Sequence, residues 1–187
     1  MQMRRPAPDP ATTMADLALP RTHGLRWLWV SVAVVLADYA TKAAMMATFR
    51  PGEERPYTSF FSLVLTFNAG AAFSLFADGD GWQRWFFAAV AVAAALLIAW
   101  LLRRGGSALY CLGLALILGG ALGNLHDRLA LGKVVDFLLF HYERWAWPAF
   151  NVADSAITIG AALLIVDSFR PRRAGDAARG AGSKAEG

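Results

Sequence analysis

Two short polar motifs of the same form could carry out acid–base chemistry in this chain. Each places an asparagine three residues before an aspartate, Asn124 before Asp127 and Asn151 before Asp154. Both motifs lie where a long apolar run meets the same polar loop, so the two carboxyl groups should face each other. Two carboxylates in contact cannot both ionise cheaply and hold one shared proton. One can then accept a proton from water while the other donates to a substrate, as amide hydrolysis without a covalent enzyme intermediate requires.

The two aspartates differ in how easily a structural role explains them. Asp154 would lie in the first turn of a helix capped by Asn151, where the helix dipole favours an acidic side chain. Asp127 would lie near the C-terminal end of a helix, where a negative charge opposes the dipole and only Arg128 offers relief. A carboxylate within or beside a membrane is costly enough to suggest a function. We therefore expect Asp127 and Asp154 to form a catalytic pair.

Four long apolar runs must position these motifs. The chain is 57% apolar and 17% charged, which is typical of a protein whose surplus apolar side chains face lipid. A bilayer core about 30 Å thick needs roughly 20 helical residues. Runs of suitable length occupy residues 25–46, 85–102, 108–125 and 150–166. The sequence thus predicts a mainly α-helical membrane protein with four transmembrane helices.

The basic residues predict the orientation of these helices. They account for a net charge of +4 and cluster before the first run, between the second and third, and after the fourth, a pattern that does not favour a nucleic-acid partner. The positive-inside rule then places both termini in the cytoplasm and the loops 47–84 and 126–149 outside. Residues 1–23 and 170–187 lack apolar periodicity, which predicts a disordered leader and tail around a membrane domain at 24–169.

Two charged residues lie inside the first run. Asp38 and Lys42 are four residues apart and share one helical face. They could form an internal ion pair that lowers the cost of two charges at membrane depth, or act directly near the site, and the sequence leaves both interpretations open. Their presence, and the length of the run, indicate a retained helix rather than a cleaved signal peptide.

The first outer loop predicts a small β-sheet between the first two helices. Residues 59–76 are rich in aromatic and β-branched side chains, and unpaired strands are excluded from lipid, so the sheet should lie outside or in the mouth of the bundle. Asn68 and Gly70 form a corner that a peptide backbone could approach closely, although a plain turn explains Asn68 equally well. In the third run, Gly119 and Gly123 have the small-xxx-small spacing of closely packed helices.

Other arrangements of reactive side chains find less support. Cys111 is the only cysteine, so no internal disulfide forms, and it lies about 22 Å along the helix from His126, which favours packing. His141, Glu143 and Asp136 lack the ligand spacing of a metal site, and no metal is expected. The rings and charges that alternate in residues 130–147 suit contact with lipid headgroups.

The motifs together resemble those of a known family. They are DYATK at 38–42, FNAGAAFS at 67–74, GGALGNLHDR at 119–128, VVDF at 134–137 and FNVADS at 150–155. Their identity and order are similar to those of the bacterial lipoprotein signal peptidases, also called signal peptidase II, and they extend from the first run to the fourth. Five separate motifs make this resemblance far more specific than one pair of aspartates.

The resemblance implies a four-helix aspartic peptidase of the bacterial inner membrane with its site near the outer face. It would cut a diacylglyceryl-modified prolipoprotein before the lipidated cysteine, as a monomer in contact with membrane lipids and without a cofactor. The family's catalytic aspartates are expected at Asp127 and Asp154. The residues expected to support the site or bind substrate are Asn68, Gly70, Asn124, Arg128, Asn151, Asp38, Lys42 and Asp136.

Two alternatives remain at this point. A serine peptidase would use Ser74 or Ser155 as the nucleophile and Lys42 as the base. A proton-coupled transporter or channel would need polar residues along a path through the bilayer, whereas here they gather at one end of the runs. The sequence identifies neither the particular prolipoproteins nor which aspartate holds the proton.

Overall fold

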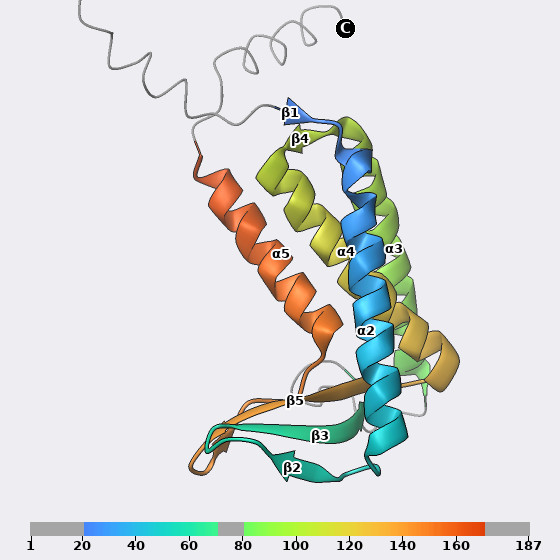
Figure 1. Cartoon of the computed structure of the whole chain (residues 1–187). Helices are drawn as coiled ribbons and strands as arrows, with labels where there is room; N and C mark the ends of the chain where they lie inside the picture. Colours follow the sequence, from blue (N-terminus) through green and yellow to red (C-terminus); the bar gives the residue numbers. More distant parts are fainter. Residues whose placement is uncertain (1–20, 71–80, 171–187) are drawn as a thin grey trace, which may run out of the picture.

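The computed structural model describes residues 21–70 and 81–170, and four helices dominate it (Figure 1). The helices are α2 (Leu28–Thr48), α3 (Trp82–Arg104), α4 (Ala108–Leu131) and α5 (Val152–Ser168). Most of the predicted leader and tail, and also Ser74, lie outside the described residues. The four predicted runs therefore correspond to four helices, and all but the end of α4 lie within about three residues of the expected bounds.

Three of these helices are long and apolar enough to cross a membrane. They are α3, α4, and α2 together with the preceding 3-10 turn η1 (Gly24–Trp27). Helix α5 has 17 residues and extends roughly 26 Å at 1.5 Å per residue, somewhat less than the thickness of a bilayer core. The fold is thus mainly helical, with three candidate membrane spans and one shorter helix.

Glycines let α4 pack closely against two of its neighbours. A Cβ atom built at Gly119 would lie 2.8 Å from the carbonyl oxygen of Ser31 on α2, and one at Gly123 would lie 2.6 Å from Oδ2 of Asp38. A Cβ at Gly120 would meet the backbone of Ala153 on α5. The predicted close approach at Gly119 and Gly123 is therefore confirmed, and it brings the polar end of α4 against α2 and α5 together.

The sheet beside the first helix loop is larger than the sequence predicted. Its antiparallel strands, in the order β2-β3-β5-β6, are β2 (Glu54–Pro56), β3 (Phe61–Asn68), β5 (Val134–Tyr142) and β6 (Trp145–Ala146). The expectation of a sheet confined to the loop between the first two helices is therefore wrong in part, because half of the strands come from the loop before α5. The register pairs Asn68 with Val134 and Thr66 with Asp136, so the β3 corner lies beside the VVDF motif.

Helix α4 extends six residues beyond its predicted end at 125. It ends at Gly132, whose φ of 76° suits a left-handed C-cap. Asp127 consequently lies inside the helix, one turn before its end, as expected from the helix position predicted for it, and the loop assigned to residues 126–149 begins later than expected.

Two apolar clusters stabilise opposite ends of the bundle. At the sheet end, Met45 and Phe49 pack against strand residues such as Leu65 and Val135. At the other end, Cys111 is fully buried among side chains of α3 and α4, which confirms its predicted packing role. There β1 (Arg21–Thr22) pairs with β4 (Gly106–Ser107), and Figure 1 shows this pair at the end of the bundle remote from the large sheet.

Candidate active site

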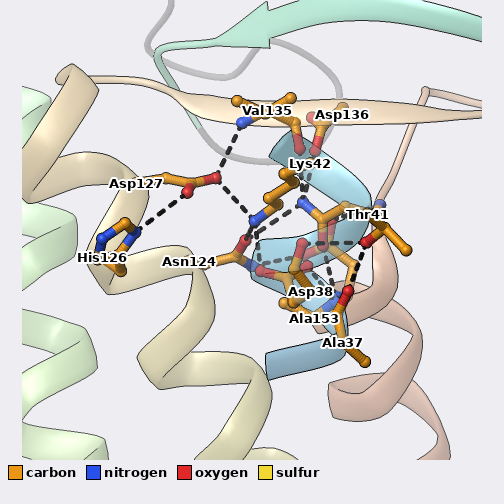
Figure 2. Close-up of polar contacts among 12 residues, drawn as sticks. Ala37, Asp38, Thr41, Lys42, Asn124, His126, Asp127, Val135, Asp136 and Ala153 are labelled. Carbon is orange, nitrogen blue, oxygen red and sulfur yellow. Dashed lines mark hydrogen bonds and ion pairs between the residues drawn. The ribbon is translucent and has the colours of Figure 1, made fainter. Parts of the chain in front are cut away.

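Lys42 lies at the centre of a buried polar cluster at the sheet end of the helices (Figure 2). Its Nζ atom is 2.7 Å from Oδ2 of Asp38 and 2.7 Å from Oδ2 of Asp127, and it donates to Oδ1 of Asn124 at 3.2 Å. The side chain is only 2% exposed, so these acceptors must replace its hydration. The predicted pair of Asp38 and Lys42 is present, and the ion pair with Asp127 is an additional one.

Asp38 connects this cluster to the start of α5. Its Oδ1 atom accepts a hydrogen bond from the backbone N–H of Ala153 at 2.9 Å. Ala153 lies in the first turn of α5, where the free N–H groups and the helix dipole favour a negative partner. Asp38 thus does more than neutralise Lys42, because it also holds α5 against α2.

The carboxyl group of Asp127 is bonded to Lys42 and to a backbone N–H, and not to Arg128, which the sequence suggested as its counter-charge. Besides the Lys42 ion pair, its Oδ2 accepts from the backbone N–H of Val135 at 3.1 Å, and His126 Nδ1 lies 3.7 Å from its Oδ1. Arg128 instead donates to the carbonyl oxygens of Asn124 and Gly70, at 3.3 and 3.4 Å. The negative charge of Asp127 is therefore balanced by Lys42, and not by Arg128 as expected.

Asp154 begins α5 as predicted, within a capping box. The Asn151 side chain accepts from the backbone N–H of Asp154 at 2.9 Å, and Asp154 Oδ2 accepts from the backbone N–H of Asn151 at 3.3 Å. In addition, the amide of Asn124 donates to Asp154 Oδ1 at 2.7 Å. Asp154 therefore accepts at both oxygens, one bond from its own helix and one from α4.

Asn151 and Asn68 hold the carboxyl group of Asp136. Asn151 is fully buried, and its Nδ2 donates to Asp136 Oδ1 at 2.7 Å. Asn68 Nδ2 donates to Asp136 Oδ2 at 3.3 Å, while its own Oδ1 accepts from the backbone N–H of Gly70 at 3.0 Å. The corner at Asn68 and Gly70 thus combines a turn with a direct contact to a site carboxyl group.

The environment of Asp136 makes it easier to protonate. Burial first, and the negative charge of Asp154 second, raise the pKa of Asp136 from 3.8 to about 7, although the hydrogen bonds from Asn68 and Asn151 oppose the rise. A carboxyl group with such a pKa exists in both protonation states near neutral pH. That property suits a group that exchanges protons during a reaction.

A cavity of about 550 Å³ opens beside these groups. Its polar lining residues include Asn68, Gly70, Asn124, Arg128, Asp136 and Asp154, and its apolar lining residues include Val134, Trp147, Pro148, Phe150, Ile157 and Ile159. Asp127 is not among the lining residues, because it lies behind Asn124 against Lys42. Among the described residues, the carboxyl groups that face this cavity belong to Asp136 and Asp154.

The structure thus brings every predicted site residue into one cluster but arranges them differently from the expectation. Asp127 and Asp154 lie on opposite sides of the Asn124 side chain, which contacts Lys42 at one end and Asp154 at the other. Asp136, expected only as a supporting residue, shares the cavity with Asp154.

The serine alternative finds no matching geometry among the described residues. Ser155 Oγ donates to the carbonyl oxygen of Asn151 at 2.9 Å, and Lys42 is held by two carboxylates. No contact between Ser155 and Lys42 is present in this part of the chain. Ser74 lies outside the described residues.

Helices of membrane-spanning length, with a carboxyl-lined and partly apolar cavity at one end, are features of the class of integral membrane enzymes. Comparison with known proteins specifies the class further. The model of the signal peptidase (SPase) II family matches residues 30–170, well over half of the chain. The chain therefore belongs to the signal peptidase II family.

Individual relatives agree with this family. The lipoprotein signal peptidase of Ralstonia nicotianae is 59% identical over 150 residues, which are 79% of this chain and 87% of that protein. The lipoprotein signal peptidase of Paraburkholderia phytofirmans is 53% identical over 166 residues, covering 86% and 96% of the two chains. The resemblance inferred from the five motifs is thus confirmed.

Two solved structures, both described as bacterial membrane enzymes, have the same fold. Each superposes with a TM-score of 0.68, at 28% and 27% sequence identity. They cover 76% and 79% of this chain, and the matched regions are 86% and 94% of their own lengths. The protein is accordingly a membrane enzyme of a peptidase family that processes lipoproteins.

Proposed function

We propose that the protein is an aspartic endopeptidase that removes the signal peptide from diacylglyceryl-modified prolipoproteins, cutting before the lipidated cysteine. The observation that carries this proposal is a single cavity lined both by two carboxyl groups and by apolar side chains. The carboxyl groups could transfer the protons that peptide hydrolysis requires, and the apolar side chains could contact the lipid of a lipid-bearing substrate. Ile159, one of the apolar lining residues, is 54% exposed, so the cavity reaches the exposed surface of α5.

The catalytic pair that the geometry supports best is Asp136 with Asp154. Both line the cavity, and the charge of Asp154 contributes to the raised pKa of Asp136, as expected for two carboxyl groups that share a proton. Asp127, the partner expected from the sequence, has less support because Lys42 neutralises it directly. Asp127 is also absent from the residues that line the cavity.

The proposed reaction uses water as the nucleophile. One carboxylate takes a proton from the water molecule, whose oxygen attacks the carbonyl carbon of the scissile peptide bond. The protonated carboxyl group gives its proton to the carbonyl oxygen, forming a tetrahedral diol. When the diol collapses, the carboxyl group that took its proton from water gives it to the leaving nitrogen, and the other carboxylate takes a proton from a diol hydroxyl group. The C–N bond breaks, and the amine and the new carboxyl end are released. Each aspartate thus acts once as base and once as acid.

Neighbouring donors support substrate binding. Arg128 uses two of its five N–H groups on the carbonyl oxygens of Asn124 and Gly70, which leaves others for substrate carbonyls at the cavity. The guanidinium also stacks over Phe87, at 5.1 Å from the ring centre, which restricts its orientation. These contacts fit a role in holding the peptide rather than in proton transfer.

We further propose that α5 forms the fourth membrane span of a monomeric inner-membrane protein with both termini in the cytoplasm. Arg103 and Arg104 end α3 near the β1–β4 pair, on the opposite side from the large sheet (Figure 1). Positive charge favours the cytoplasmic side, which leaves the sheet and the cavity near the outer face. At roughly 26 Å, α5 would cross with help from local bilayer thinning or its flanking residues.

The test is a cleavage assay with purified enzyme in detergent. A diacylglyceryl-modified prolipoprotein and the same prolipoprotein without the lipid serve as paired substrates. We expect cleavage of the modified substrate alone, immediately before the lipidated cysteine. Equal cleavage of both, or cleavage at another position, would reject the proposed specificity.

A further inference from the structure

The orientation of the Asn124 side chain follows from its neighbours. An amide has an oxygen that accepts and an NH₂ group that donates, and only the surrounding groups decide which end faces which. Lys42 Nζ can only donate, so the amide oxygen must face it, at 3.2 Å. Asn151 Nδ2 donates to the same oxygen at 3.2 Å. The NH₂ group of Asn124 is therefore directed at Asp154 Oδ1, at 2.7 Å.

The NH₂ group of Asn124 contributes to a difference in surroundings between the two carboxyl groups of the cavity, Asp154 and Asp136. Asp154 accepts from Asn124 and from the backbone N–H of Asn151, and it lies in the first turn of α5, where the dipole favours negative charge. Asp136 also accepts two amide hydrogen bonds, but it lies on a strand and is only 2% exposed. Both carboxyl groups thus accept two hydrogen bonds, but only Asp154 also lies at the N-terminus of a helix.

Other charged groups add to the same difference. Those around the pair are Asp38 and Lys42 on α2, Asp127, Arg128 and the adjacent His126 on α4, and Asp136 on β5. Among the site carboxylates, Asp154 has the strongest electrostatic interaction with Arg128. Lys42 is largely neutralised by its two carboxylate partners, so its main effect on Asp154 passes through the orientation of Asn124.

We propose that Lys42, acting through Asn124, is a positioning residue that keeps Asp154 as the ionised base and leaves the shared proton on Asp136. The inference rests on the proposed peptidase reaction and adds the direction in which that reaction begins. Asp154 takes the proton from water, and Asp136 protonates the carbonyl oxygen of the substrate. Lys42 is not among the residues that line the cavity, so it is assigned no direct part in bond breaking.

The pH dependence of cleavage tests this proposal. Loss of the Asn124 donor should move the acid limb of the kcat/KM profile to higher pH by about one unit, because Asp154 then holds its charge less well. Two variants remove the donor or its orientation in different ways: Asn124→Ala, and the double variant Lys42→Met with Asp127→Asn. The double variant removes one positive and one negative charge, so the net charge of the cluster stays unchanged.

Two controls separate this effect from a general disturbance. Asp127→Asn alone keeps the contact of Lys42 with Asn124, and we expect no upward shift of its acid limb. Thr41→Val alters a neighbour of Lys42 whose hydroxyl bonds only to backbone carbonyls of its own helix, and its profile should match the wild type. Adding Asn124→Ala to the double variant should shift the limb no further, since both changes act on one donor.

A uniform loss of kcat with an unmoved acid limb in both test variants would overturn the proposal and leave Lys42 with a structural role only. If the double variant does not fold, Asn124→Ala decides the question by itself. Failure of the proposed function looks different, because the wild-type enzyme would then cleave no lipid-modified substrate at any pH.

Discussion

Lys42, Asp38 and Asp127 form a buried group of charges in which the lysine pairs with both carboxylates. Lys42 is almost fully buried between Asp38 and Asp127, and either carboxylate without it would be an isolated buried charge, which costs several kcal/mol. Asp127 is thereby committed to an ion pair. Among the described residues, no Lys or Arg side chain forms an ion pair with Asp136. In the proposed mechanism, this difference separates the structural carboxylate of Asp127 from the proton-exchanging carboxyl group of Asp136.

The raised pKa of Asp136 predicts a specific pH dependence of stability. The folded protein holds this proton up to about pH 7, whereas the unfolded chain releases it near 3.8, so the folded state binds more protons between these values. The contribution of Asp136 to stability therefore falls as pH rises through this window. Asp136→Asn has no such pH-dependent loss of stability. The Tm of the variant minus the Tm of the wild type should therefore increase by a few degrees between pH 5 and pH 8.

Thermal unfolding of both proteins in the same detergent measures this difference. Glu143→Gln, a charge-neutralising change at an exposed residue of the turn between β5 and β6, serves as the matched control. A Tm difference for Asp136→Asn that is the same at both pH values would show that Asp136 is not protonated in the folded protein.

Sequence reasoning named the residues of the proposed site and placed the catalytic pair at Asp127 and Asp154, whereas the lining of the cavity favours Asp136 with Asp154. The Asn-x-x-Asp spacing of Asn124 and Asp127 does place both on one helical face, but that face is turned toward Lys42 and only Asn124 reaches the cavity. Asp136 has no comparable local signal. It reaches the cavity because β5 pairs with β3, a contact between residues about seventy positions apart.

At the scale of elements, the helices were predictable and the sheet was not. An apolar run of about 20 residues has few alternatives to a membrane helix, which is why α2, α3 and α4 appear close to their expected bounds. Strand pairing depends on partners distant in sequence, so the part of the sheet contributed by residues 134–146 was assigned to a loop. The end of α4 was missed because His126, Asp127 and Arg128 look like loop residues.

The packing of α4 against α5 predicts a strong effect of one glycine. Gly120→Val places a branched side chain against the backbone of Ala153 and the side chain of Ile157. Because backbone cannot give way as a flexible side chain can, we expect α5 to move and Asp154 to lose its contact with Asn124. Cleavage of the modified substrate should fall at least tenfold, with a lower Tm.

The matched control is Ala130→Val, which adds bulk at an exposed position of the same helix. It should retain near wild-type cleavage and Tm. Normal activity of Gly120→Val would show that the separation of α4 and α5 is not critical for the site.

At the scale of the whole molecule, the two ends of the bundle should face different compartments. The single cysteine is fully buried, so a Cys111→Ala background allows single cysteines to be introduced as reporters. Trp145→Cys lies on the sheet at a residue that is 83% exposed, and Arg104→Cys lies at the other end of α3. In intact cells, a membrane-impermeant maleimide should label Cys at 145 but not at 104.

After the cells are lysed, both positions should react, which controls for accessibility. Labelling of position 104 alone in intact cells would invert the proposed orientation. It would also place the cavity on the cytoplasmic side, where the proposed outer-face reaction could not occur.

The central claim is that Asp136 and Asp154 act as the catalytic pair while Asp127 serves to hold Lys42. The most direct measurement compares the cleavage rates of Asp136→Asn, Asp154→Asn and Asp127→Asn on a diacylglyceryl-modified prolipoprotein, with folding checked by Tm. We predict a loss of at least about a thousandfold for the first two, because each removes a proton-transfer group, and measurable turnover for the third. Near wild-type cleavage by a folded Asp136→Asn, together with an inactive but folded Asp127→Asn, would contradict the claim.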